Sequence, residues 1–184
     1  LCYLCFIRAN PWLNCFSRLT EMDILAAQVG GALKSHGLML ATAESCTGGG
    51  VAQAITDVAG SSAWFERGFI TYSNLAKQQM LRVSEETLKQ HGAVSEATVR
   101  EMVAGALANS AAQVALAVSG IAGPDGGTAD KPVGTVWFAW GIKHGATHAQ
   151  RHQIGGDRAE VRAQAVRIAL QGVVNMLNQL IKIA

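Results

Sequence analysis

Ser45 lies in a short polar and glycine-rich segment, Ala43-Glu44-Ser45-Cys46-Thr47-Gly48-Gly49-Gly50, which directly follows the apolar run 38–41. We interpret this pattern as a buried strand that ends in a tight turn and opens a helix. The free backbone N–H groups at a helix start attract anions and can hold a developing oxyanion. A hydroxyl at this place is a candidate nucleophile, although serine is also a common N-cap of helices.

Cys46 is a second candidate nucleophile, because a thiolate at a helix start has a lowered pKa. Its place next to Ser45 favours a side chain that is directed into the core, so we expect Ser45 to carry the chemistry. The segment lacks the Gly-x-Ser-x-Gly pattern of α/β-hydrolases, which argues against that family.

Tyr72 and Lys77 form a second candidate group. We expect Tyr72 to end a strand and Lys77 to lie in the first turns of the next helix. Strand ends at one edge of a sheet can face each other, so these side chains could converge on Ser45. A lysine in a cleft of low dielectric loses its charge readily and can serve as the general base that a serine nucleophile needs. The alternative is a surface lysine beside a tyrosine that packs at a strand end.

A glycine-rich loop at 119–128 follows a second predicted buried strand, at 114–118. Gly126 and Gly127 allow close backbone approach and positive φ angles, and consecutive N–H groups in such a loop can bind an anion. Ligands of open α/β sheets bind at the carboxyl ends of strands, where this loop and Ser45 are both predicted to lie. Most glycine loops are structural, so the loop supports a site only together with Ser45.

Three histidines, His144, His148 and His152, are spaced four residues apart, which would suit a zinc site on one helix face. Gly141 and Gly145 favour a hairpin in this region instead. We therefore expect no metal site here.

The composition limits the classes of protein that the chain can be. Its 184 residues are enough for one domain with a full core, and 49% hydrophobic against 15% charged residues predicts a compact globular fold. The net charge of +2 and the scattered basic residues argue against a nucleic-acid partner. No apolar run approaches the roughly 20 residues of a membrane span, so we expect no membrane partner. Three of the four cysteines lie in the first fifteen residues, so no disulfide framework is expected and a reducing cytoplasm fits best.

Helices and strands mostly alternate along the chain, which predicts an α/β protein built in layers. Helices are expected at 48–58 and from Met22 and Asn74, and strands at 38–42, 64–71, 114–118, 133–142 and 147–154. Ser84 and Ser95 are predicted N-caps of further helices, and Asp157 with Glu160 predicts a capping-box-like start of the last helix. The last two strands are predicted to form a hairpin, which makes the sheet mixed. Residues 1–21 show no periodicity, so we expect an N-terminal tail outside the fold and a domain at 22–184.

Six segments in order make residues 22–184 resemble the CinA C-terminal domain family. They are Ala43-Glu44-Ser45-Cys46-Thr47-Gly48-Gly49, Gly60-Ser61-Ser62, Thr71-Tyr72-Ser73-Asn74 with Lys77, Gly92-Ala93-Val94-Ser95, Gly120-Ile121-Ala122-Gly123-Pro124 with Gly126-Gly127-Thr128, and Pro132-Val133-Gly134-Thr135. The chain departs from the family pattern at two positions. Ser119 stands where threonine is expected, and Gly50 stands where an apolar residue is usual.

The resemblance implies a three-layer α/β/α sandwich with a mixed, mostly parallel sheet, and a homo-oligomer. Stand-alone members of the family are nicotinamide mononucleotide (NMN) amidohydrolases, so it also implies hydrolysis of the NMN carboxamide to nicotinate mononucleotide and ammonia. The implied catalytic residues are Ser45 as nucleophile, with Lys77 and Tyr72 nearby as the base or as a proton relay. The resemblance implies no metal, and we expect no cofactor.

We expect backbone N–H groups around Cys46 to Gly48 to stabilise the oxyanion, and the glycine loop with Thr47 to hold the ribose phosphate. The candidate substrate-binding residues are Cys46, Thr47, Gly48, Gly49, Ser119, Gly120, Gly126, Gly127 and Thr128. Two other classes of function stay open. One is a non-catalytic module that binds a nucleotide or a partner, and the other is an amidase for a different pyridine or nucleoside amide.

Overall fold

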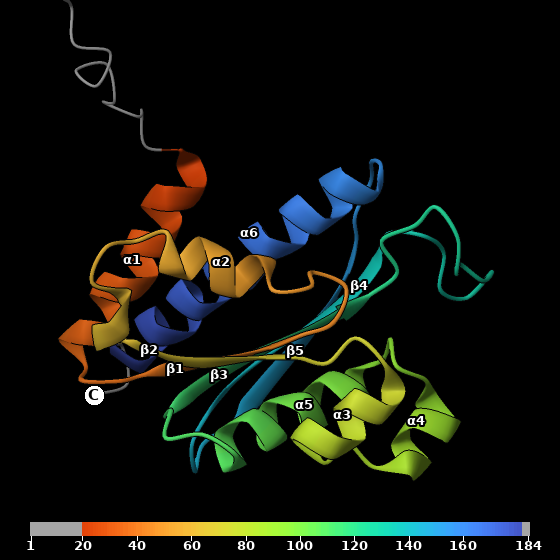
Figure 1. Cartoon of the computed structure of the whole chain (residues 1–184), viewed down its shortest axis with the longest axis horizontal. Coiled ribbons are helices and arrows are strands. Elements are labelled where there is room, and N and C mark those ends of the chain that lie inside the picture. The colour runs from red at the N-terminus through yellow and green to blue at the C-terminus, as the bar shows by residue number, and fades with distance from the viewer. Residues whose placement is uncertain (1–19, 182–184) are drawn as a thin grey trace, which may run out of the picture.

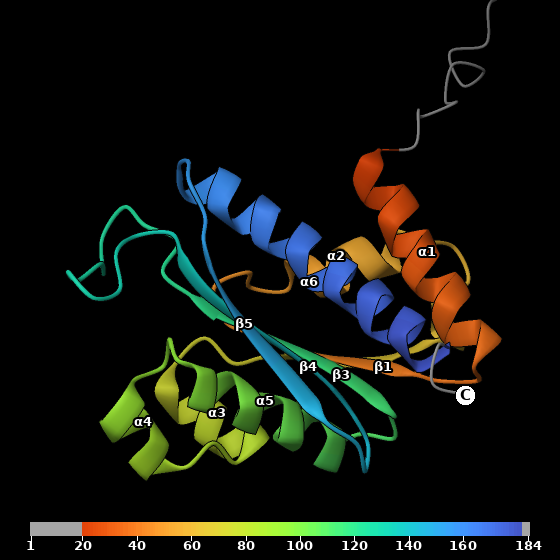
Figure 2. The ribbon, with the colours of Figure 1, turned by 180° about the vertical axis from the view of Figure 1, so that it is seen from behind.

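A computed structural model of the protein describes residues 20–181. The strands are β1 (Leu40–Glu44), β2 (Phe65–Ile70), β3 (Val114–Gly120), β4 (Thr135–Ile142) and β5 (Thr147–Gln153). The helices are α1 (Glu21–Ser35), α2 (Gly50–Thr56), the 3-10 turn η2 (Ser61–Ala63), α3 (Asn74–Leu81), α4 (Glu85–His91), α5 (Glu96–Ala108) and α6 (Arg158–Ile181). Figure 1 shows α1, α2 and α6 on one face of the sheet and α3, α4 and α5 on the other, and the opposite view in Figure 2 agrees. The predicted three-layer α/β/α sandwich is confirmed.

The sheet has the strand order β2-β1-β3-β4-β5. β1 pairs in parallel with β2 and β3, whereas β4 is antiparallel to both β3 and β5. Four of the five strands therefore run in one direction, although the neighbouring pairs divide equally between parallel and antiparallel. The predicted hairpin is β4 with β5, and it is what makes the sheet mixed.

The sheet separates two hydrophobic cores that differ in side-chain size. On the side of α1, α2 and α6 the strands contribute large residues such as Leu116 and Phe138. On the side of α5 the central strands contribute mainly alanine, including Ala43, Ala115 and Ala117. Successive strand residues point to opposite faces, which explains why a continuous apolar run can serve both cores.

Local cap chemistry sets several helix boundaries. Thr20 caps α1 in a capping box with Asp23, so this helix begins at Glu21, one residue before the predicted start. Residues 1–19 of the predicted tail lie outside the described residues, whereas Thr20 and Glu21 belong to the α1 start. The N-caps predicted at Ser84 and Ser95 are confirmed, with α4 and α5 following them. Asp157 and Glu160 exchange hydrogen bonds at the start of α6, as predicted.

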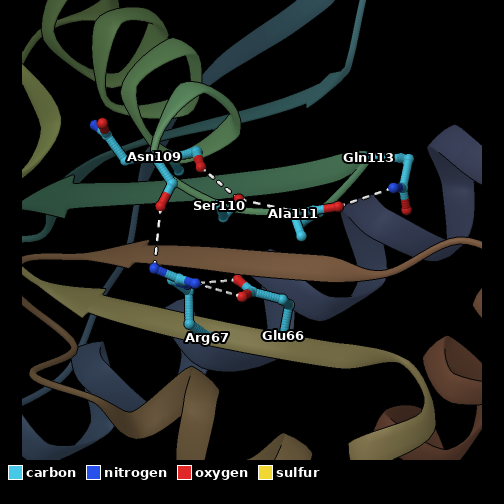
Figure 3. Close-up of polar contacts among 8 residues, drawn as sticks. Glu66, Arg67, Asn109, Ser110, Ala111 and Gln113 are labelled. Atoms are coloured by element: carbon cyan, nitrogen blue, oxygen red, sulfur yellow. Dashed lines mark hydrogen bonds and ion pairs between the residues drawn. The ribbon is translucent and has the colours of Figure 1, made fainter.

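Polar contacts fix the amino-terminal end of the parallel strands. Figure 3 shows Arg67 of β2, which is paired with Glu66 at 2.6 Å and donates to the Asn109 carbonyl at 3.1 Å. The Gln113 side chain accepts a hydrogen bond from the Met39 backbone at 3.0 Å. These contacts tie the segment between α5 and β3 to the strands beside it. The turns that follow the strands are at the opposite end of the sheet.

Two predictions about binding partners concern the described residues directly. None of the described helices is long and apolar enough to cross a membrane. Within residues 20–181, no three His, Cys, Asp or Glu side chains are grouped so that they could hold a metal ion. His144 lies in the turn of the β4–β5 hairpin, and His148 and His152 lie on β5.

Candidate active site

A cavity of about 240 Å³ lies at the carboxyl ends of β1, β2 and β3. It is lined by Ser45, Cys46, Tyr72, Lys77, Ala93, Val94, Ser119, Gly120, Ala122 and Arg158. The three predicted catalytic residues thus share one cavity, and three residues of the glycine-rich loop, Ser119, Gly120 and Ala122, also line it.

Ser45 and Lys77 are in direct contact. The Lys77 Nζ atom lies 2.9 Å from Ser45 Oγ and donates to the Thr71 carbonyl at 2.8 Å. Only 7% of Ser45 and 1% of Lys77 is exposed to solvent. Burial lowers the pKa of Lys77 to about 8. A neutral amine is therefore accessible near neutral pH, at hydrogen-bond distance from the hydroxyl that it would deprotonate.

Backbone pairing holds this contact in place. The Ser45 N–H donates to the Val118 carbonyl at 3.0 Å, which continues the pairing of β1 with β3 beyond the strand end. On the other side, the Thr71 N–H donates to the Glu44 carbonyl at 2.7 Å. Ser73 then caps α3 and places Lys77 in its first turns. Ser45 thus directly follows β1, whereas Lys77 is carried by the first turn of the helix that follows the neighbouring strand β2.

Tyr72 lines the cavity but does not join the pair. Its side chain is 63% exposed, and its hydroxyl accepts a hydrogen bond from Arg158 Nη2 at 3.2 Å. Among the described residues it makes no hydrogen bond with Ser45 or Lys77. The expected convergence therefore holds for Ser45 and Lys77 as a contact, and for Tyr72 only as a shared cavity. The geometry offers no direct path for a proton relay through Tyr72.

Glu44 is a site residue that the sequence analysis missed. Its buried carboxylate accepts hydrogen bonds from the N–H groups of Gly49, Val51 and Ala52 at 2.9–3.0 Å, and from the Thr47 hydroxyl at 2.7 Å. The first N–H groups of α2 are thus occupied by a side chain of the protein. The available signal in the sequence was an acidic residue between a predicted buried strand and a glycine-rich turn, because a charge that is buried there requires partners.

This finding corrects the prediction for the oxyanion donors. The Gly48 N–H donates to the Ser45 carbonyl at 3.1 Å, and the Gly49 N–H donates to Glu44. The N–H groups of Cys46 and Thr47 remain as candidate oxyanion donors, because they donate to no other residue in the described part of the chain. Gly48 and Gly49 instead allow the tight turn, because both have positive φ angles, of 60° and 95°. The Thr47 hydroxyl, expected to hold phosphate, is engaged by Glu44.

Cys46 is packed into the core, as expected. Its residue is 6% exposed and belongs to the cluster beneath α1, α2 and α6. Burial raises the pKa of its thiol to about 11, so the thiol stays protonated at neutral pH. This environment is unsuitable for a cysteine nucleophile.

The glycine loop contributes unevenly to the cavity. Ser119 and Gly120 line it, although the Ser119 hydroxyl donates to the Ala93 carbonyl at 2.7 Å. Gly126, Gly127 and Thr128 lie outside the residues that line it. A second cavity of about 560 Å³ lies beside the first, between the start of the loop and α6, and the two share Ala122 and Arg158.

Two arginines of α6 complete the site, and the sequence analysis missed both. Arg158 donates to the Gly123 carbonyl at 2.8 Å and borders both cavities. Arg162 donates through Nε to the Cys46 carbonyl at 3.1 Å and through Nη2 to the Thr47 carbonyl at 2.9 Å. The four-residue spacing places them on one helix face, directly after the capping box, and that spacing was the signal.

Comparison with known proteins agrees with this architecture. The family model for the CinA C-terminal domain, which describes the sequences of that family, matches residues 22–177. A relative from Escherichia coli (strain K12), named nicotinamide-nucleotide amidohydrolase PncC, is 60% identical over 152 residues, which is 83% of this chain and 92% of the relative. A relative of the same name from Pseudomonas putida is 53% identical over 158 residues, covering 86% and 98%. The crystal structure of competence/damage inducible protein CihA from Agrobacterium tumefaciens is similar, with a TM-score of 0.83, 46% identity and coverage of 86% and 96%.

Proposed function

This chain belongs to the CinA C-terminal domain family, and we propose that it hydrolyses the carboxamide of NMN to nicotinate mononucleotide and ammonia. Two relatives that are named for this activity are more than half identical to the chain over most of their length, which supports the substrate. The reaction mechanism rests on one observation, the contact of Lys77 Nζ with Ser45 Oγ at 2.9 Å inside the cavity.

In the proposed first step, neutral Lys77 takes the hydroxyl proton while Ser45 Oγ attacks the carboxamide carbon. The carbonyl oxygen becomes an oxyanion, and the N–H groups of Cys46 and Thr47 are its donors. Such a donor stabilises the transition state by roughly 3 kcal/mol. Protonated Lys77 then gives its proton to the amide nitrogen, the C–N bond breaks, and ammonia leaves.

In the second step water replaces ammonia. Lys77 takes a proton from water, whose oxygen attacks the acyl carbon, and the C–O bond to Ser45 breaks as Lys77 returns the proton to Ser45 Oγ. The products are the free enzyme and nicotinate mononucleotide. Lys77 alone thus moves both protons, which assigns Tyr72 to the cavity wall, where its hydroxyl contacts Arg158.

The shape and charge of the region suit a nucleotide. The smaller cavity holds the reactive pair and would take the pyridine ring, while Arg158 stands at its border with the larger cavity. A guanidinium in this position favours a ligand whose phosphate extends between the two cavities. In this proposal Gly126, Gly127 and Thr128 contact only the part of the nucleotide that lies beyond the smaller cavity, because none of them lines it.

The test is release of ammonia and nicotinate mononucleotide from NMN by the purified protein. Ser45→Ala should reduce the turnover number at least about a thousandfold with unchanged thermal unfolding. Ser62→Ala, at an exposed serine, is the matched control and should behave as the wild type.

Three results would contradict the proposal. Retained turnover in Ser45→Ala would remove the nucleophile. Faster hydrolysis of free nicotinamide than of NMN would indicate an amidase for a different substrate. Binding of NMN without release of ammonia would indicate a non-catalytic binding module.

A further inference from the structure

Arg162 lies outside the sheet, on α6, and binds the turn that carries the nucleophile. It reaches this turn from α6, more than a hundred residues further along the chain, and its side chain is half-buried. Its two hydrogen bonds go to consecutive carbonyls, those of Cys46 and Thr47. Among the described residues, Arg162 is the only donor to the Cys46 carbonyl.

The Cys46 carbonyl and the Thr47 N–H belong to the same peptide group. This peptide is trans, because the only cis bond in the described residues is Gly123-Pro124. In a trans peptide the C=O and N–H bonds point to opposite sides, so the Thr47 N–H points away from Arg162. A cation that binds the carbonyl withdraws electron density from the amide and makes its N–H a stronger donor.

The contacts of the rest of the turn leave this peptide to Arg162. Glu44 fixes the N–H groups of Gly49, Val51 and Ala52, and the β1–β3 pairing fixes the Ser45 N–H. None of these bonds involves the Cys46 carbonyl or the Thr47 N–H. The Thr47 N–H is also one of the two amides that remain available for an oxyanion.

We propose that Arg162 is a positioning residue for the amide hydrolysis: it orients and polarises the Cys46–Thr47 peptide so that the Thr47 N–H stabilises the oxyanion. This inference rests on the proposed function. Arg162 also lines the larger cavity, but its Nε and Nη2 groups are bonded to the turn, so in this scheme it touches neither reacting atom and acts through the backbone. Because the oxyanion exists only after the attack, the loss of Arg162 should lower kcat and leave KM nearly unchanged.

The test compares Arg162→Met and Arg162→Lys with Arg167→Met, a matched control at an exposed arginine of the same helix. We expect kcat for NMN to fall roughly 10- to 100-fold in Arg162→Met, with KM within about threefold of the wild type. Arg162→Lys keeps the charge but loses the two-pronged contact, so its kcat should fall about fivefold. Arg167→Met should match the wild type in both constants. If Arg162→Met fails to fold, Arg162→Lys decides the test.

A second readout does not depend on NMN. In the reaction with a fluorophosphonate probe, Lys77 takes the hydroxyl proton, Ser45 Oγ bonds to phosphorus, the P–F bond breaks and fluoride leaves. Negative charge develops on the phosphoryl oxygen, so the rate of labelling also reports the oxyanion donors. The labelling rate should fall in Arg162→Met while the final labelled fraction stays that of the wild type. A merely structural role would instead lower the labelled fraction or raise KM, and either result would overturn the inference, as would wild-type kcat in Arg162→Lys.

This design separates the two proposals. A wild-type protein that is labelled at Ser45 without hydrolysing NMN would refute the proposed function, and the labelling rates would still test Arg162. A wild-type protein that shows neither reaction would overturn both.

Discussion

Two glycine-containing segments leave the same edge of the sheet, the turn at 45–49 and the loop at 121–134, and they differ in what holds them. The turn lies between a buried carboxylate, Glu44, and a guanidinium, Arg162, and its first N–H extends a strand pairing. The loop is exposed from residue 124 to 130, and Thr128 and Lys131 bond mainly to each other within it. Both follow parallel neighbours in the sheet, β1 and β3.

The comparison shows that glycine content does not reveal which backbone N–H groups are available to a ligand. In the turn, the glycines allow the chain to fold back so that a carboxylate of the protein itself can bind the helix start. Two non-glycine residues, Cys46 and Thr47, keep the available N–H groups. Buried contacts with distant residues therefore define the reactive segment, and their absence from the exposed part of the loop predicts a lesser role there.

The largest expected effect on the reaction comes from the loss of the base that contacts the turn, Lys77. Lys77→Met should reduce the turnover of NMN about a thousandfold at pH 7.5, because Ser45 then has no proton acceptor. Lys89→Met, at an exposed lysine that pairs with Glu85, should leave turnover unchanged. A reduction of less than tenfold in Lys77→Met would assign the proton transfer to another group.

The free energy of unfolding of Lys77→Met should show that this variant loses activity without losing its fold. The pKa of Lys77 is about 8 in the folded protein, against a usual value of 10.5. The unfolded chain thus binds more protons between these values, and the free energy of unfolding rises with pH from 8 to 10.5. Below pH 8 the folded state carries the cost of a buried charge, so at pH 7 Lys77→Met should be more stable, on the order of 1–3 kcal/mol. Chemical denaturation measures this difference.

The next effect tests the support of the turn. Glu44→Ala leaves one buried and two half-buried N–H groups, and the buried Thr47 hydroxyl, without their acceptor, and should lower the free energy of unfolding by about 3 kcal/mol. Asp125→Ala removes an acidic residue from the exposed loop and should change it by less than about 0.5 kcal/mol. Equal stabilities of the two variants, measured by urea unfolding, would contradict the difference between turn and loop.

A smaller effect is the pH dependence of the reaction. Lys77 is charged below its pKa of about 8 and cannot accept a proton there. We expect kcat/KM to rise about tenfold per pH unit up to that value and then to level off. A profile from pH 6 to 10 that is flat, or that falls across pH 8, would rule out a neutral lysine as the base.

The smallest effect should come from the loop. The Thr128 hydroxyl accepts a hydrogen bond from the Lys131 N–H at 3.1 Å, and Thr128 lies outside the cavity of Ser45. Thr128→Ala should leave kcat for NMN within twofold and raise KM at most about threefold. Steady-state kinetics would refute this expectation if KM rose thirtyfold, because the loop would then be a primary binding element.

The sequence by itself determined the layered α/β class, the β4–β5 hairpin, the caps at Ser84 and Ser95, and the candidates Ser45 and Lys77. These features depend on neighbouring residues: side-chain periodicity, turn chemistry and the short distance between a strand end and the helix after it. The polar groups that follow two parallel strands can meet at one edge, which is why Ser45 and Lys77 could be paired in advance.

Only the tertiary structure decided which groups of that edge remain available. It placed the Tyr72 hydroxyl against Arg158 instead of Lys77, engaged the α2 N–H groups with Glu44, and brought Arg162 to the turn. The two arginine contacts join residues 86 and 116 positions apart. The physical reason is that hydrogen-bonding capacity is a property of residue type, but its use depends on the partners that folding brings within about 3 Å.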